Sequence, residues 1–137
     1  MKTNTTIEWV DIKPLRRGKN NSTTIRMHYH SSKGKKKNPY CMVSFPGLIR
    51  KDELDKTFCR FGKLSGKVII KFNNESGVKL SKSVHSNNSK DLKVYGKGVC
   101  EFVLNSMSCQ LFEGNYDLSF SKIADNTYII DSLKYDV

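Results

Sequence analysis

The residues of this chain whose types and spacing come closest to a metal or catalytic site are His28 and His30, two histidines separated by one residue. Imidazoles bind transition metals and transfer protons near neutral pH. Either role needs further ligands or acids nearby, and no acid-rich cluster lies near this pair in the sequence. We therefore predict no metal site and no catalytic role for these histidines, and expect phosphate contact or plain surface exposure instead.

The segment around the histidines is strongly basic. Residues 1–68 contain 16 Lys/Arg and 5 Asp/Glu and so account for the whole net charge of +11, whereas residues 69–137 contain 8 of each. A surface of one sign is typical of proteins that bind a polyanion, although solvated loops without a partner are the alternative. The predicted nucleic-acid contacts in this region are Lys13, Arg16, Arg17, Lys19, Arg26, His28, His30, Lys33, Lys35, Lys36 and Lys37.

Enzyme motifs are missing from the sequence. It has no Gly-rich phosphate loop followed by Lys-Ser/Thr, no Gly-x-Ser-x-Gly and no His-Glu-x-x-His. A nuclease usually needs carboxylates that hold a metal ion, and the only local group of acids is Asp52-Glu53-Leu54-Asp55. We interpret these acids as favourable charges at the N-terminus of a helix. The chain is therefore predicted to be no enzyme and to need no cofactor.

The elements that must position the basic residues are predicted to be mostly strands. Residues 24–29 alternate, so that Arg26 and His28 share one face with His30, and Tyr29 shares the opposite, apolar face with its neighbours. Runs of β-branched and aromatic residues predict further strands at 7–12, 40–45, 68–72, 78–80, 92–95, 99–104, 116–120 and 127–130. Polar segments at 16–23, 30–38 and 81–90 are predicted loops. Tyr29 and Tyr40 bracket the second loop as candidates for stacking on bases, with the core as the alternative.

One segment has a helical period instead. Leu54, Phe58 and Phe61 lie at i, i+4 and i+7, and Gly62 follows as a stop signal, which predicts one amphipathic helix over about 49–61. We predict one domain, 1–137, that folds as a mainly β barrel or sandwich of short antiparallel strands. Two runs of strand, link, Gly-led strand, hairpin and strand are consistent with either an internal duplication or an independent meander.

Cysteine spacing and hydropathy limit where the protein acts. Cys41, Cys59, Cys100 and Cys109 lack the paired spacing of a zinc or redox site, so we expect buried, reduced thiols. The first residues lack the apolar core of a signal peptide, and no apolar run is long enough to span a bilayer. We expect a cytoplasmic protein without a membrane partner.

The chain contains Met42-Val-Ser-Phe-Pro and, further on, the stretch from Gly66-Lys-Val-Ile-Ile to Gly77-Val-Lys-Leu. With these two stretches, residues 42–80 resemble AbrB-like transition-state regulators and antitoxins. The resemblance implies a swapped-hairpin barrel of two interlocked chains that binds DNA. It also implies that Arg50, Lys51 and Arg60 face the DNA. The link from Phe61 to Gly66 departs from the family, which has Leu-Gly followed by Gly-Asp there.

The sequence therefore predicts a small basic nucleic-acid-binding protein, with DNA favoured, that acts as a transcriptional regulator or a regulator from a phage or mobile element, alone or as a homodimer. The alternative is a non-enzymatic inhibitor or adaptor. Such a protein would bind an acidic protein surface or the nucleic-acid site of a host enzyme, as an anti-defence protein does.

Overall fold

The structure is a computed structural model that describes residues 23–31, 40–83 and 90–136. These residues form eight strands and two helices. The strands are β1 (Ile25–His30), β2 (Tyr40–Ser44), β3 (Phe58–Leu64), β4 (Lys67–Asn73), β5 (Val78–Lys79), β6 (Lys93–Tyr95), β7 (Gly114–Ala124) and β8 (Thr127–Asp136). The helices are α1 (Gly47–Glu53) and α2 (Lys97–Ser106).

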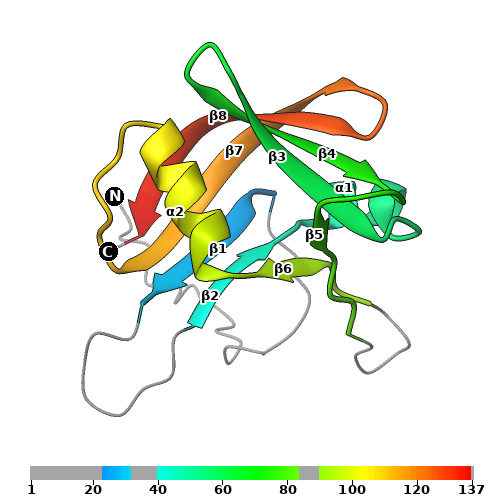
Figure 1. Cartoon of the computed structure of the whole chain (residues 1–137), viewed down its shortest axis with the longest axis horizontal. Helices are drawn as coiled ribbons and strands as arrows, with labels where there is room; N and C mark the ends of the chain where they lie inside the picture. The colour runs from blue at the N-terminus through cyan, green and yellow to red at the C-terminus, as the bar shows by residue number, and fades with distance from the viewer. Residues whose placement is uncertain (1–22, 32–39, 84–89, 137) are drawn as a thin grey trace, which may run out of the picture.

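All eight strands belong to one antiparallel sheet with the order β5-β3-β4-β8-β7-β1-β2-β6. Its two edges meet where Ser81, just after β5, pairs with Lys93 of β6. The sheet thus curls into a nearly closed barrel, with α2 packed against β1, β2 and β4 (Figure 1). The prediction of a small, mainly β barrel of antiparallel strands is confirmed.

The same order of elements occurs twice along the chain. We call β1-β2-α1-β3-β4 the first half-barrel (25–73) and β5-β6-α2-β7-β8 the second half-barrel (78–136), because each supplies half of the strands; around the barrel, strands of the two halves interleave. The halves join through four pairs, β1–β7, β2–β6, β3–β5 and β4–β8, and exchanging the halves leaves the strand order around the barrel unchanged. The topology is therefore repeated, and each repeat has the order strand, strand, helix, strand, strand rather than the order that the sequence suggested.

The predicted helix over 49–61 is wrong in its second half. Helix α1 ends at Glu53, and Phe58 begins strand β3. Seven residues of β3 pair with β4, and these non-local hydrogen bonds outweigh a weak helical period. Asp52 and Glu53 consequently lie in the last turn of α1 rather than the first, so the interpretation from the helix dipole is also wrong. Glu53 is instead fully buried.

The predicted strand over 99–104 is also wrong, because these residues belong to helix α2. Its β-branched and aromatic residues suggested a strand, but Cys100, Val103 and Leu104 have the i, i+3, i+4 spacing of one helical face. All three side chains are fully buried in the core of the barrel. The helix stops at Ser106, and the chain turns at Ser108, which has a positive φ of 57°.

The inner face of the barrel is apolar, as the alternation of β1 predicted. Ile25, Met27 and Tyr29 point inward and join one continuous hydrophobic core. The four cysteines are unpaired, and all are buried except Cys109, which is partly exposed. In the described part of the chain, neither helix has the length and apolar character that are needed to cross a bilayer.

Candidate nucleic-acid interface

The outward side chains of β1 form the centre of the candidate interface. Arg26, His28 and His30 are partly exposed and alternate with the buried residues, as predicted. The register places β7 on one side of β1 and β2 on the other, with β6 beyond β2. We call this surface the β1 face; it consists of Arg26, His28, His30, Tyr40, Lys93, Tyr95, Asn115 and Asp117.

The two histidines converge on one amide group. His28 Nδ1 lies 2.7 Å from Asn115 Oδ1, and His30 Nε2 lies 3.1 Å from the same oxygen. Because an amide oxygen only accepts hydrogen bonds, both imidazole nitrogens donate to it. The ring of Tyr40 stacks on that of His30, with 6.4 Å between centroids and 23° between planes, and also contacts the ring of His28. Burial, with a smaller effect from the positive charge of Arg26, lowers the pKa of His28 below its usual value.

The permanent charges described on the β1 face occur in ion pairs. Arg26 Nε lies 3.2 Å from Asp117 Oδ1, and Lys93 Nζ lies 2.9 Å from the buried carboxylate of Asp91. Each basic group thus has an acidic partner at short range. Imidazoles are in general the side chains that change charge near neutral pH, and within the described part of the β1 face they occur at His28 and His30.

The most basic loop of the sequence begins and ends on this face. His30 and Tyr40 are cross-strand partners, so both ends of the loop between β1 and β2 are fixed there. Glu113 holds the start of the loop, since its carboxylate accepts hydrogen bonds from the backbone amide and the hydroxyl of Ser31. The predicted contacts Lys13, Arg16, Arg17, Lys19, Lys33, Lys35, Lys36 and Lys37 lie outside the described residues.

The other predicted contacts lie elsewhere. Arg50 and Lys51 are in the last turn of α1, and Arg60 is an exposed residue of β3. Since β1 and β3 are four strands apart in both directions around the barrel, Arg60 faces away from β1. Arg60 is paired with Lys71 of β4. On the same outer face of β4, Lys67 lies four residues before Lys71, next to the β3–β4 turn.

Of this second basic surface, the sequence predicted only Arg60, and Lys67 and Lys71 were missed. We call Arg60, Lys67 and Lys71 the β3–β4 face, and all three are exposed. Like charges directly opposite each other on a sheet repel, so Arg60 and Lys71 do not stabilise the hairpin. The alternation of Lys67, Ile69 and Lys71 was visible in the sequence, but the helix predicted over 49–61 hid their partner strand.

The two tyrosines that bracket the basic loop have different environments. Tyr29 is buried in the core, and its hydroxyl donates to Glu101 Oε2 over 2.8 Å, so it is not available for stacking on bases. Tyr40 is 46% exposed on the β1 face, and Tyr95, which the sequence analysis did not select, is 49% exposed on the neighbouring strand β6. Tyr40 and Tyr95 therefore leave aromatic surface open to a partner.

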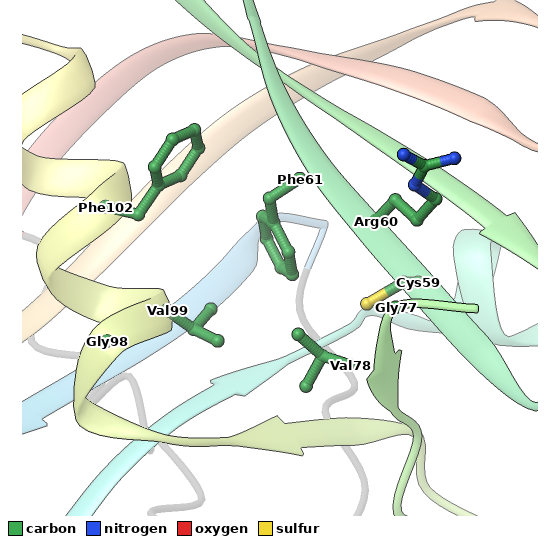
Figure 2. A pocket seen from close by; sticks show the side chains of 8 residues that line it. All are labelled: Cys59, Arg60, Phe61, Gly77, Val78, Gly98, Val99 and Phe102. Atoms are coloured by element: carbon green, nitrogen blue, oxygen red, sulfur yellow. The ribbon is translucent and has the colours of Figure 1, made fainter.

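A separate pocket of about 320 Å³ lies between β3, β5 and α2. Figure 2 shows the side chains of Phe61, Val78, Val99 and Phe102 gathered around one space, while the guanidinium of Arg60 points away from it. The thiol of Cys59 also lines the pocket, and burial raises its pKa to about 12, which keeps it protonated and unreactive. The pocket is therefore suited to apolar contact rather than to nucleophilic chemistry.

The described residues also contain no group of three or more His, Cys, Asp or Glu side chains placed to hold a metal ion. Comparisons of the chain with protein-family models, with curated proteins and with solved structures found no match. Functional inference consequently depends on the two basic faces and the pocket.

Proposed function

We propose that this protein is a small, non-enzymatic nucleic-acid-binding protein that prefers DNA. In this proposal the β1 face and the loop between β1 and β2 contact the phosphate backbone. The observation that carries the proposal is the pairing of His30 with Tyr40 on the β1 face, because the sequence between these two residues contains Lys33, Lys35, Lys36 and Lys37. Lysine side chains in general follow a phosphate backbone without needing a fixed geometry.

The distribution of charge between the half-barrels also supports this proposal. Residues 25–73 contain 12 basic and 3 acidic residues, whereas residues 78–136 contain 7 of each. A polyanion binds where unbalanced positive charge is concentrated, because each phosphate contact releases condensed counterions. The exposed rings of Tyr40 and Tyr95 add surface on which bases can stack.

We further propose a regulatory role in the cytoplasm, as a transcriptional regulator or a regulator from a phage or mobile element. The resemblance to AbrB-like regulators favours this role, and four unpaired cysteines are typical of a reducing compartment. One chain forms a nearly closed barrel, so a second, interlocked chain is not needed to complete the sheet. A homodimer would then pair two barrels.

The test is a fluorescence-anisotropy titration of the full chain with labelled DNA at several salt concentrations. In the variant R16E/R17E/K35E/K36E we expect an affinity loss of about a hundredfold or more and a shallower dependence on salt. The matched control R60E/K63E/K67E/K71E changes the net charge by the same amount on the opposite side of the barrel. We expect it to lose less than about threefold at moderate salt, where long-range charge effects are screened.

Two outcomes would contradict the proposal. If both variants lost affinity equally, net charge alone would govern binding and the β1 face would have no special role. If the unaltered protein showed no salt-dependent binding to DNA or RNA, the nucleic-acid function would be wrong.

The second candidate is an inhibitor or adaptor that binds an acidic protein surface. The observation that favours it is the position of Arg60, which belongs to the β3–β4 face and also lines the apolar pocket. An apolar centre with a charged rim is typical of protein interfaces. A stoichiometric protein partner recovered from nuclease-treated lysate, and lost in the variant R60E/K71E, would support this second function.

A further inference from the structure

We propose that nucleic-acid binding on the β1 face is coupled to proton uptake by His28 and His30, so that the protein binds nucleic acid more tightly as the pH falls. This inference rests on the proposed function and adds a control of affinity to it. The geometric basis is the convergence of His28 Nδ1 and His30 Nε2 on the single oxygen Oδ1 of Asn115.

The hydrogen bonds to Asn115 determine which nitrogens take up protons. In the neutral rings, His28 Nδ1 and His30 Nε2 carry the hydrogens that are donated to the amide oxygen. The remaining nitrogens, His28 Nε2 and His30 Nδ1, are therefore the ones that bind a further proton. Protonation leaves both hydrogen bonds to Asn115 in place, so the face gains positive charge without a rearrangement.

The surroundings of His28 favour its neutral form until an anion binds. Burial of the ring lowers the pKa of His28, and the positive charges of Arg26 on β1 and Lys93 on β6 lower it further, against the hydrogen bond to Asn115, which raises it. Arg26 and Lys93 already have their own acidic partners, Asp117 of β7 and Asp91. These two ion pairs therefore neutralise the permanent positive charges on the described part of the β1 face.

Among the described residues, the remaining titratable neighbours of the pair are few. The ring of Tyr40 of β2 packs against both imidazole rings. Glu113, just before β7, is bound by Ser31 at the end of β1. Asp136 of β8 is the backbone partner of Asn115 in the register.

A phosphate group on this face reverses the balance. Its negative charge favours the imidazolium form, so the complex holds more protons than the free protein and the phosphate. By linkage, a ligand that favours the protonated form binds more tightly at lower pH. Each proton taken up contributes up to about a tenfold gain in affinity per pH unit.

The experiment is the anisotropy titration repeated at constant ionic strength from about pH 8 to about pH 5.5, the range over which imidazoles titrate. We expect the dissociation constant of the unaltered protein to fall at least about fivefold across this range. In H28Q/H30Q, whose glutamines keep polar side chains on the face, this dependence on pH should disappear. The variant H85Q, which removes the third histidine of the chain, should behave like the unaltered protein.

A direct measurement separates proton uptake from a merely structural role. NMR titration of the imidazole resonances should show that His28 and His30 hold their protons to higher pH in the DNA complex than in the free protein. Salt-dependent but pH-independent binding would overturn the coupling and leave the proposed function standing, as would a pH dependence that persists in H28Q/H30Q. Absence of salt-dependent binding at every pH would instead remove the proposed function and this inference together.

Discussion

The two half-barrels have the same order of elements but differ in net charge. The first half-barrel, 25–73, is strongly basic, whereas the second, 78–136, has equal numbers of basic and acidic residues. Their inner faces nevertheless contribute to one apolar core. The difference teaches that the inward residues of each strand specify the barrel, while the outward residues are free to carry charge for a partner.

Each half-barrel fastens its helix to the other half through a Glu–Tyr hydrogen bond. Glu53 of α1 accepts from the hydroxyl of Tyr128 over 2.8 Å, and Glu101 of α2 accepts from Tyr29 over 2.8 Å. Glu53 is fully buried and also accepts from the side-chain amide of Asn126. Glu101 is 30% exposed and has Lys97 3.8 Å away. The same kind of hydrogen bond is therefore shielded from solvent at Glu53 and partly open to solvent at Glu101.

The largest effect that we expect comes from truncating these two glutamates. Glu53→Ala leaves Tyr128 and Asn126 without their buried acceptor and should lower the free energy of unfolding by about 3 kcal/mol. Glu101→Ala should cost about 1 kcal/mol, because water can reach the hydroxyl that it leaves behind. Urea denaturation measures both changes. Glu53→Gln keeps one acceptor and should restore part of the loss, and equal costs for the two alanine variants would show that the halves do not differ.

A somewhat smaller effect is expected at Gly77, in the connection between the half-barrels. This glycine has a φ of +128°, and a Cβ atom there would lie 2.4 Å from the carbonyl oxygen of Cys59. Gly77→Ala should therefore destabilise the protein by about 2 to 3 kcal/mol. Gly66, in the β3–β4 turn, has a φ of +79° but open space around it, so Gly66→Ala should cost about 1 kcal/mol. Thermal and urea unfolding compare the two, and a milder effect at Gly77 would be contrary to this account.

A further effect appears at alkaline pH. Burial raises the pKa of Tyr29 to about 12 and also raises that of Tyr128, in each case with help from the nearby glutamate. A group whose pKa is higher in the folded state stabilises the fold below its unfolded pKa, about 10 for tyrosine, and this contribution is lost as the pH rises through the folded value. Unfolding midpoints measured at about pH 9 and about pH 11 should therefore fall less in Tyr29→Phe than in the unaltered protein. An identical fall in both would count against this prediction.

The smallest effect concerns His28. Its lowered pKa means that the folded protein prefers the neutral imidazole, so stability present above the unfolded pKa of about 6.5 is lost as the pH falls through that value. His28→Gln should flatten this part of the stability profile, with melting temperatures followed from about pH 7.5 to about pH 5.5. A steeper acid loss in the variant would reverse the assigned sign.

Local patterns predicted those elements whose period agrees with their final partners. The alternation in β1 placed Arg26, His28 and His30 on one face correctly. The spacing of Leu54, Phe58 and Phe61 suggested a helix, but residues 58–64 form a strand that pairs with β4. The composition of residues 99–104 suggested a strand, but they belong to a helix with one face buried in the core. In both cases tertiary partners, which no local window contains, outweighed local preference.

The candidate site shows the same limit of local patterns. The histidine pair was visible in the sequence, but its partner Asn115 is 87 residues from His28 along the chain. Asp117, which neutralises Arg26, is similarly remote and becomes a neighbour only through the β1–β7 pairing. The sequence therefore revealed where positive charge was abundant, whereas the pairing of strands determined how much of it is compensated.

The two edges of the sheet are joined by a single bridged residue pair, which is fewer pairs than any two neighbouring strands of the sheet share. Ser81 and Lys93 exchange two backbone hydrogen bonds, of 2.7 and 3.0 Å, whereas β7 and β8 pair along most of their length. Such a short contact can open while the rest of the barrel stays folded, so these two amides should exchange with solvent deuterium well before that of Ile70. Because Lys93 also belongs to the β1 face, a ligand held there would slow this exchange and strengthen the wall at its weakest point.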